Sequence, residues 1–255
     1  MSHSAEPTFD MPFELASLAK AVNYQRWVWE AVQPYMGRRI LEVGAGIGNM
    51  SQWLPVRERL VLTETEPTLL PILRARTPQY FGDGASKVSV SSLDLSRPSD
   101  AHQLEREAFD TIVSFNVLEH IEDDRAAVRQ LLDILRASDQ PVRRLVSFVP
   151  AQAWALSQMD RFYGHFRRYS ASGLRELSLE LAPDARVSLA SFNAIGLLGW
   201  VWTTLIVKRT TIDPGAVTAF DAICPYIKTL DNFACRRLRY PFGQSLVWVL
   251  TLPRP

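Results

Sequence analysis

The chain has 255 residues, of which 47% are hydrophobic and 22% charged; this composition excludes a disordered or fibrous protein and fits one large domain, or one domain with a small addition. Its 28 basic and 27 acidic residues leave a net charge of +1, without the basic stripe that a nucleic-acid partner would require. Cys224 and Cys235 form neither a disulfide framework nor a zinc site, so no metal is expected. No run is apolar enough to predict an integral membrane segment, and the chain is expected to be cytoplasmic.

Helical and strand patterns alternate along the first 150 residues. A helix is predicted over residues 13–35, and an amphipathic helix over 126–135. Short apolar strands are predicted at 39–44, 59–63, 88–93, 109–115 and 144–149. Beyond Pro150, the pattern predicts a helix at 172–181 and strands at 186–192 and 245–252.

Strands separated by helix-sized segments indicate a parallel sheet that is covered on both faces. The predicted fold class is therefore α/β: a Rossmann-like, doubly wound, mostly parallel seven-stranded sheet with an antiparallel last strand and a C-terminal helical insertion. Three regions follow from this pattern: an N-terminal helical lid (1–36), a main domain (37–255), and a helical cap inserted at about 194–242. Aromatic residues of the cap could line a pocket, form a dimer face or touch a membrane surface, although core packing is the commonest explanation for each one singly.

The strand at 39–44 runs into alternating glycines, Gly44, Gly46 and Gly48, and Glu42 stands two residues before the first. Glycines allow a ligand to approach the backbone closely, and a following helix N-terminus offers free N–H groups. The pattern favours a nucleotide-like or carboxylate-bearing ligand at this strand end. The dinucleotide fingerprint needs a third glycine where Asn49 stands, which disfavours an NAD(P)-dependent oxidoreductase but leaves it open as an alternative.

The E-x-G-x-G-x-G segment at 42–48 resembles motif I of the class I S-adenosylmethionine-dependent methyltransferases. Other motifs of that family follow in order, each after a strand. Glu64 resembles the acidic residue that binds the cofactor ribose, with Glu66 as a rival, and the 94–95 and 116–121 segments resemble the adenine-contacting pair and the N-V-L-E-H motif. The resemblance assigns cofactor binding to Glu42, Gly44, Gly46, Gly48, Glu64, Thr65, Asp94, Leu95, Asn116 and Val117.

Residues 160–169 read D-x-x-x-G-H-x-R-R-Y and resemble a segment of a bacterial subgroup of these enzymes. The resemblance implies an enzyme that moves a methyl group from S-adenosylmethionine to oxygen or nitrogen, with sulfur open, of a small-molecule acceptor and leaves S-adenosylhomocysteine (EC 2.1.1.-). A cofactor-binding subunit without turnover stays open as an alternative, as does a homodimer.

Methyl transfer from a sulfonium is an in-line displacement, and a hydroxyl or ammonium acceptor must also lose a proton. The catalytic candidates are His120, His165 and Tyr163, although both histidines could have a purely structural role, and a sulfur, carbon-acid or free-amine acceptor needs no base. Glu119 could approach the sulfonium or favour a helix N-terminus. The substrate-binding candidates are Tyr24, Arg26, Arg167, Arg168 and Tyr169; either arginine could instead pair with a structural carboxylate.

Overall fold

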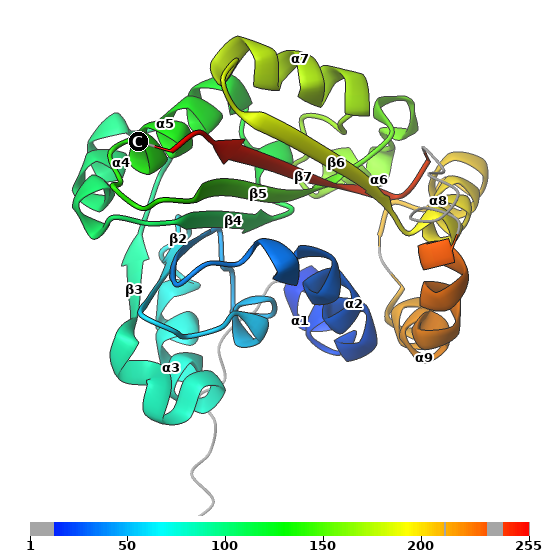
Figure 1. Ribbon diagram of the computed structural model, residues 1–255. Helices are drawn as coiled ribbons and strands as arrows, with labels where there is room; N and C mark the ends of the chain where they lie inside the picture. The colour runs from blue at the N-terminus through cyan, green and yellow to red at the C-terminus, as the bar shows by residue number, and fades with distance from the viewer. Residues whose placement is uncertain (1–12, 212, 234–241, 255) are drawn as a thin grey trace, which may run out of the picture.

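The computed structural model describes residues 13–211, 213–233 and 242–254. Its centre is a twisted seven-stranded sheet with helices on both faces (Figure 1). The strands are β1 (Arg39–Val43), β2 (Arg59–Glu64), β3 (Val88–Ser92), β4 (Thr111–Phe115), β5 (Arg143–Pro150), β6 (Arg186–Phe192) and β7 (Ser245–Leu252). They lie in the order β3-β2-β1-β4-β5-β7-β6, and β7 runs antiparallel to both of its neighbours. This confirms the predicted fold class, a Rossmann-like mixed sheet.

Helices connect the strands and cover the sheet (Figure 1). They are α1 (Phe13–Ala19), α2 (Val22–Val32), α3 (Leu70–Phe81), α4 (Pro98–Leu104), α5 (Asp124–Arg136), α6 (Gln158–Phe162), α7 (Ala171–Leu181), α8 (Ala194–Trp200) and α9 (Pro214–Asp231). A 3₁₀ turn, η5 (Leu118–His120), follows β4, and a π-helix, η7 (Val201–Ile206), continues α8.

The prediction of one helix over residues 13–35 is wrong. The helix is interrupted at Lys20 and Ala21, and Ala21 has a non-helical ψ angle of 60°. The Gln25 side chain donates a 2.7 Å hydrogen bond to the Leu18 carbonyl across the break. The interruption separates α1, whose Leu15 lies at the glycine loop, from α2, which packs on the sheet, and both helices also contact α9. This is a tertiary effect that apolar periodicity does not report.

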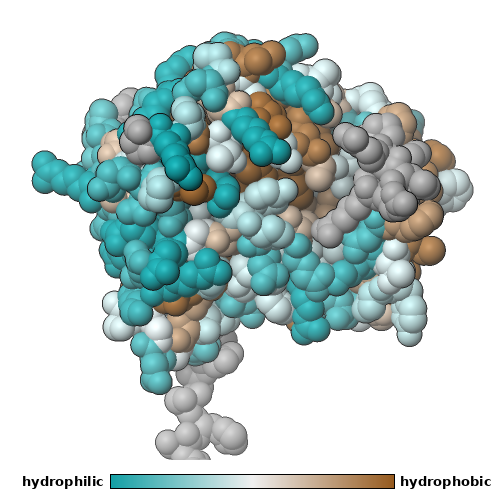
Figure 2. All heavy atoms as spheres, viewed as in Figure 1, coloured by the Kyte–Doolittle hydropathy of each residue, from teal (hydrophilic) through white to brown (hydrophobic). Residues whose placement is uncertain are grey.

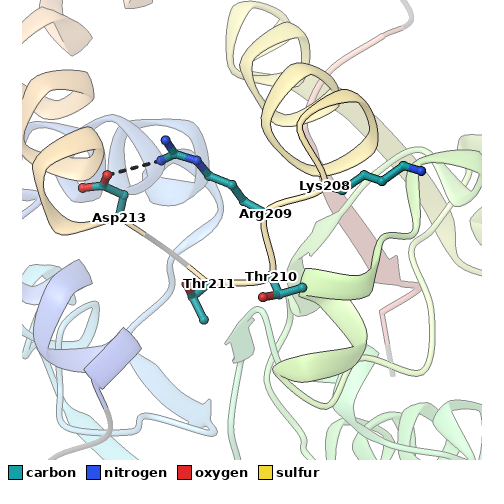
Figure 3. Close-up of a pocket in the computed structure, with 5 residues that line it drawn as sticks. All are labelled: Lys208, Arg209, Thr210, Thr211 and Asp213. Carbon is teal, nitrogen blue, oxygen red and sulfur yellow. Dashed lines mark hydrogen bonds and ion pairs between the residues drawn. The ribbon is translucent and has the colours of Figure 1, made fainter.

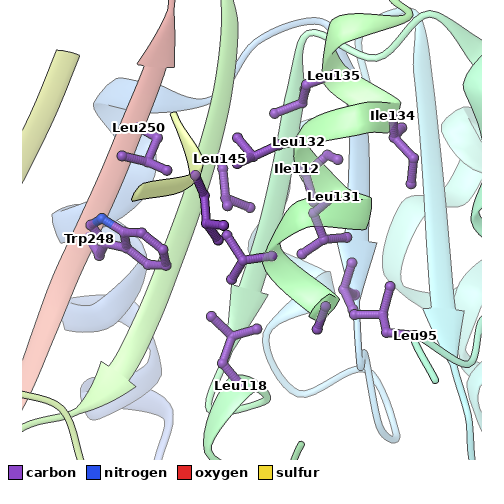
Figure 4. Packing of buried hydrophobic residues seen from close by; sticks show 14 of the residues in the cluster. Leu95, Ile112, Leu118, Leu131, Leu132, Ile134, Leu135, Leu145, Trp248 and Leu250 are labelled. Carbon is purple, nitrogen blue, oxygen red and sulfur yellow. The ribbon is translucent and has the colours of Figure 1, made fainter. Parts of the chain in front are cut away.

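Two hydrophobic layers hold the helices to the sheet because side chains alternate along each strand. On one face, α5 and α7 pack on β4, β5 and β7, and Figure 4 shows Leu131, Leu132 and Leu135 of α5 facing this layer. Trp248 of β7 is fully buried there and donates a 3.0 Å hydrogen bond to Ser178 Oγ. On the other face, α2 and α9 contribute Trp27, Val28, Val32, Cys224 and Ile227.

The helices α8, η7 and α9 follow one another between β6 and β7 and leave several large apolar side chains exposed. Figure 2 shows brown, hydrophobic surface gathered at the edge of the molecule where Figure 1 places α8 and α9. The exposed side chains include Leu198, Trp202, Ile206, Tyr226, Leu230 and Phe233. No helix within the described residues is long and apolar enough to cross a bilayer. The lid and cap boundaries stay predictions, and residues 1–12 of the lid and 234–241 of the cap, Cys235 among them, lie outside the described residues.

Candidate functional site

The order of the strands places the candidate site. The chain leaves β1 toward β2 on one side and returns to β4 on the other, so β1 lies where the winding direction of the sheet reverses. In open parallel sheets, ligands bind outside the carboxyl ends of the strands at this position. The glycine loop follows β1 there, Glu64 ends β2, and Asn116 follows β4.

The glycine loop contains three residues with positive φ, at Gly44 (+67°), Gly46 (+57°) and Gly48 (+87°). A Cβ added to Gly44 would lie 2.5 Å from Cγ2 of Val117, and one added to Gly48 would lie 2.8 Å from the Tyr80 ring. Backbone conformation and space therefore both require glycine at these two positions. The loop is held close to the start of η5, which connects the candidate cofactor site to the candidate acceptor site.

The Glu64 carboxylate binds the glycine loop directly. Its Oε2 accepts a 2.7 Å hydrogen bond from the Gly46 N–H, and its Oε1 accepts from the N–H groups of Thr65 and Glu66 at 2.8 and 2.9 Å. Each carboxylate oxygen has two acceptor positions, so Oε2 retains capacity for a further donor. Glu64, rather than its rival Glu66, is therefore the carboxylate fixed beside the glycines.

Glu42 lies beneath the loop, with 1% of its surface exposed. Burial, with the Glu64 carboxylate nearby, raises its pKa to about 8. Its Oε2 has no hydrogen-bond partner among the described residues. The Ser51 hydroxyl lies near this carboxyl and opposes the rise in its pKa. The Oε2 atom can also accept from a donor that a ligand brings, such as an ammonium or hydroxyl group.

The remaining predicted cofactor residues lie at or after neighbouring strand ends. Asp94 accepts from Ser96 Oγ at 2.6 Å, and the hydrogen bonds from Ser96 hold its pKa below the usual value. Leu95 is buried. Asn116 has a φ of +51°, a left-handed conformation that asparagine tolerates better than most residues, and its side chain is exposed.

A second group of polar side chains surrounds Asp160, which is completely buried. Ser157 and Asp160 form a capping box at the start of α6, which fixes the carboxylate in place. Asp160 accepts from Arg168 Nε at 2.9 and 3.0 Å and lies 3.1 Å from His165 Nδ1. Burial opposes ionisation, but the bonds from His165 and Arg168 prevail and hold the pKa of Asp160 well below its usual range.

Glu119 and His120 approach this group from η5. The rings of His120 and His165 are perpendicular, with centroids 4.6 Å apart. The protein around the His120 ring partly desolvates it, although solvent still reaches one side, and with the neighbouring His165 this lowers the pKa of His120. Glu119 is fully buried, and burial raises its pKa to about 8.

The predicted substrate-binding residues have partners within the protein. Arg168 is buried with Asp160 and lies over the Trp200 ring at 4.2 Å. Arg167 pairs with Asp124 at 2.6 Å, and Tyr169 donates to the same carboxylate at 2.9 Å.

The other predicted residues of the acceptor side lie on α2 and beside α6. Tyr24 contacts the rings of Trp27 and Phe192 edge-on, whereas Arg26 is exposed on the same helix. Tyr163 follows α6 and packs edge-on against Phe162. Their roles stay predictions.

The sequence assigned no role to Asp160, and it predicted α1 only as part of a helical lid over residues 1–36. Asp160 begins the D-x-x-x-G-H-x-R-R-Y segment, and the Ser157-x-x-Asp160 capping-box spacing could have shown that its carboxylate is fixed. Helix α1 covers the glycine loop: Asn49 donates a 2.9 Å hydrogen bond to the Leu15 carbonyl, and the Leu15 side chain is the nearest neighbour of Gly46. No local pattern reports this long-range contact.

A polar pocket lies elsewhere, in the segment that joins η7 to α9 (Figure 3). Its lining includes Lys208, Thr210, Thr211 and an ion pair of 3.2 Å between Arg209 and Asp213. It contains none of the predicted site residues, and the ion pair is exposed. We therefore assign no cofactor role to it.

The strand order and the position of the glycine loop beside Glu64 define a Rossmann-like α/β fold. Its sheet has the strand order of the class I methyltransferases. Residues 41–138, from β1 through α5, match a family model described as a methyltransferase domain. No curated protein matches the chain.

Solved structures of methyltransferases share the fold. A SAM-dependent methyltransferase from Archaeoglobus fulgidus is 16% identical with a TM-score of 0.56, covering 94% of this chain and 100% of its own. The methyltransferase domain of bacterial CtHen1 is 12% identical with a TM-score of 0.54, covering 91% and 100%. The plantazolicin methyltransferase BpumL, solved in complex with SAH, is 12% identical with a TM-score of 0.51, covering 94% and 84%.

Proposed function

We propose that this protein is an S-adenosylmethionine-dependent methyltransferase that acts on an oxygen or nitrogen atom of a small molecule. The observation that carries the proposal is the Glu64 carboxylate hydrogen-bonded to the Gly46 N–H at the carboxyl edge of β1 and β2. This pair lies within the residues that match a methyltransferase domain. The BpumL structure, which shares the fold, holds SAH.

In this proposal the residues of the strand edge hold the cofactor. Glu64 accepts from the ribose hydroxyls, Thr65 lies beside it, and the glycine loop gives the ligand access to the backbone. The unpartnered Oε2 of buried Glu42 supports this assignment because it can accept from a ligand's ammonium group. Asp94 and Leu95 would flank the adenine.

Bound S-adenosylmethionine would supply the methyl group and a good leaving group. The acceptor atom would take this methyl group as the carbon–sulfur bond breaks, with S-adenosylhomocysteine as the other product, and the proton of a hydroxyl or ammonium acceptor would pass to a base or to water. The protein's part is to hold acceptor and cofactor in line and to exclude water. Val117 contacts the glycine loop, and Glu119 and His120 follow it in the same turn, so η5 would bring the acceptor side to the cofactor.

Calorimetric titration with S-adenosylhomocysteine, with NADH as a comparison ligand, tests the proposal. Wild-type protein should bind S-adenosylhomocysteine at micromolar concentration and NADH much more weakly. Glu64→Gln should weaken binding at least about tenfold, the equivalent of about 1.4 kcal/mol. Glu66→Gln is the matched control because its exposed carboxylate lies two residues further along.

The outcomes separate the alternatives. A preference for NADH would favour an oxidoreductase, and binding of neither ligand would refute the assignment of the loop. Binding of S-adenosylhomocysteine without methyl transfer across a broad panel of acceptors would favour a cofactor-binding subunit. The small-molecule acceptor, a cytoplasmic location and a homodimer stay predictions.

A further inference from the structure

Three side chains that can bind metals converge at the end of β4. Glu119, His120 and His165 each offer one ligand atom, and these atoms all lie within 4.8 Å of one another. Two come from the η5 turn and one from a segment 45 residues later. In a tetrahedral site with metal–ligand bonds of 2.0–2.1 Å, the ligand atoms are about 3.4 Å apart. Small side-chain rotations that shift these atoms by about 1 Å would therefore complete the site.

The backbone already holds the two segments together. The Phe166 N–H donates a 2.8 Å hydrogen bond to the Glu119 carbonyl, and the His165 N–H donates a 2.9 Å bond to the Asp160 carbonyl. Gly164 has a φ of +81°, and a Cβ placed on it would lie 3.6 Å from His120 Nδ1. The convergence is therefore part of the fold.

His165 is oriented by a carboxylate, as metal-binding histidines usually are. Its Nδ1 lies 3.1 Å from Asp160 Oδ1. A hydrogen bond from Nδ1–H to Asp160 fixes the tautomer and leaves the Nε2 lone pair available. Arg168 and the Ser157 capping box hold Asp160 in place, so the carboxylate that orients His165 is itself fixed.

Glu119 is the independent observation that points to a ligand. Its side chain is 0% exposed, and neither carboxylate oxygen has a hydrogen-bond partner among the described residues. A buried carboxyl group without partners is costly, and native proteins keep one where a ligand or ion satisfies it. Both histidines offer ligand atoms within 4.8 Å of it, and solvent reaches both residues, His120 more than His165.

We propose that Glu119, His120 and His165 bind a divalent transition-metal ion. Two imidazoles and one carboxylate with open coordination positions suit zinc or iron(II), whereas magnesium and calcium prefer ligand sets made of oxygen. The sequence predicted no metal, because the three residues are spread over two segments and carry none of the common zinc-ligand spacings.

The metal site would add a step to the proposed function, and its role depends on that function. The η5 turn that carries Glu119 and His120 also contacts the glycine loop through Val117, so the ion would lie near the candidate cofactor site and would bind an acceptor with a hydroxyl or carboxylate oxygen. Metal binding lowers the pKa of a hydroxyl group; its proton would pass to water, and the resulting oxygen would take the methyl group from the sulfonium. The two histidines would then act as ligands and would not serve as the base.

Cobalt(II) provides a direct test because its visible absorption reports the ligands that surround it. Untagged full-length protein, treated with a chelator and desalted, is titrated with Co²⁺ and, in parallel, with Mg²⁺. Glu119→Gln and His165→Ala test the site. His102→Ala is the matched control, since His102 is exposed and also pairs with a glutamate, Glu105, at 2.7 Å.

Wild-type protein and His102→Ala should bind one Co²⁺ with the same affinity and spectrum, and Mg²⁺ at least about tenfold more weakly. Each site variant should weaken Co²⁺ binding at least about tenfold, with a thermal melt confirming that it is folded. Absence of Co²⁺ binding to the wild type, or equal binding to the folded site variants, would overturn the proposal.

Titration with S-adenosylhomocysteine separates this inference from the proposed function. Protein that binds S-adenosylhomocysteine but not Co²⁺ would retain the proposed function and lose the metal site. Protein that binds Co²⁺ through these residues but no S-adenosylhomocysteine would retain the metal site and lose the methyltransferase assignment.

Discussion

Replacing Asp160 by asparagine should destabilise the protein strongly. The change removes a negative charge from a fully buried position while Arg168, which is 6% exposed, keeps its positive charge. The new amide group also brings donor hydrogens toward Arg168 Nε and the Ser157 N–H, which are themselves donors. Breaking a buried ion pair in this way costs about 3–5 kcal/mol.

A loss of this size is readily measured by thermal unfolding. For a chain of this length, each kcal/mol lowers Tm by about 2–4 °C, so the expected decrease is about 6–20 °C. The matched control is Asp133→Asn, which removes the same charge from an exposed pair with Arg136 at 3.4 Å and should cost at most about 0.5 kcal/mol. Equal Tm values for the two variants would refute the argument that the buried pair holds the segment after α6.

Three further changes test other parts of the structure. Gly44→Ala should weaken S-adenosylhomocysteine binding at least about tenfold in calorimetry, because the new Cβ would lie 2.5 Å from Val117. Gly82 also has a positive φ, but a Cβ there would meet nothing within 4 Å, so the control Gly82→Ala should leave binding unchanged. Glu42 has a folded-state pKa of about 8 against an ordinary value of 4.5, so wild-type stability should fall as the pH rises through this interval. Glu42→Gln should remove the Glu42 share of that slope in denaturant unfolding, while the share of Glu119, whose pKa is also about 8, remains. The variant should be about 3 kcal/mol more stable than wild type at pH 7, whereas parallel pH profiles would contradict the burial argument. Trp248→Phe removes a buried indole and its hydrogen bond and should lower the unfolding free energy by about 1–3 kcal/mol; a loss below about 0.5 kcal/mol would show that the core repacks around it.

Local sequence patterns predicted most of the fold because each strand is short, apolar and bounded by turn residues. The strands at 186–192 and 245–252 agree with β6 and β7 residue for residue. The break in the N-terminal helix could not be predicted in this way. It depends on α1 packing over the glycine loop, which is a contact between distant parts of the chain.

The candidate cofactor site was predictable for the same reason. Its residues lie at strand ends, and the parallel topology brings strand ends together, as the hydrogen bond between Glu64 and Gly46 shows. The surroundings of Asp160 were not predictable, because they depend on the fold of the segment after β5. The same fold brings His165 to Glu119 and His120, three residues whose spacing in the sequence carries no metal-binding pattern.

A crystal structure of the protein grown with S-adenosylhomocysteine tests the central claim most directly. The ligand should lie at the carboxyl edge of β1 and β2, with its ribose hydroxyls on the Glu64 carboxylate and its amino acid portion beside the glycine loop. A ligand bound elsewhere, or one that leaves Glu64 without contact, would refute this assignment of the cofactor site.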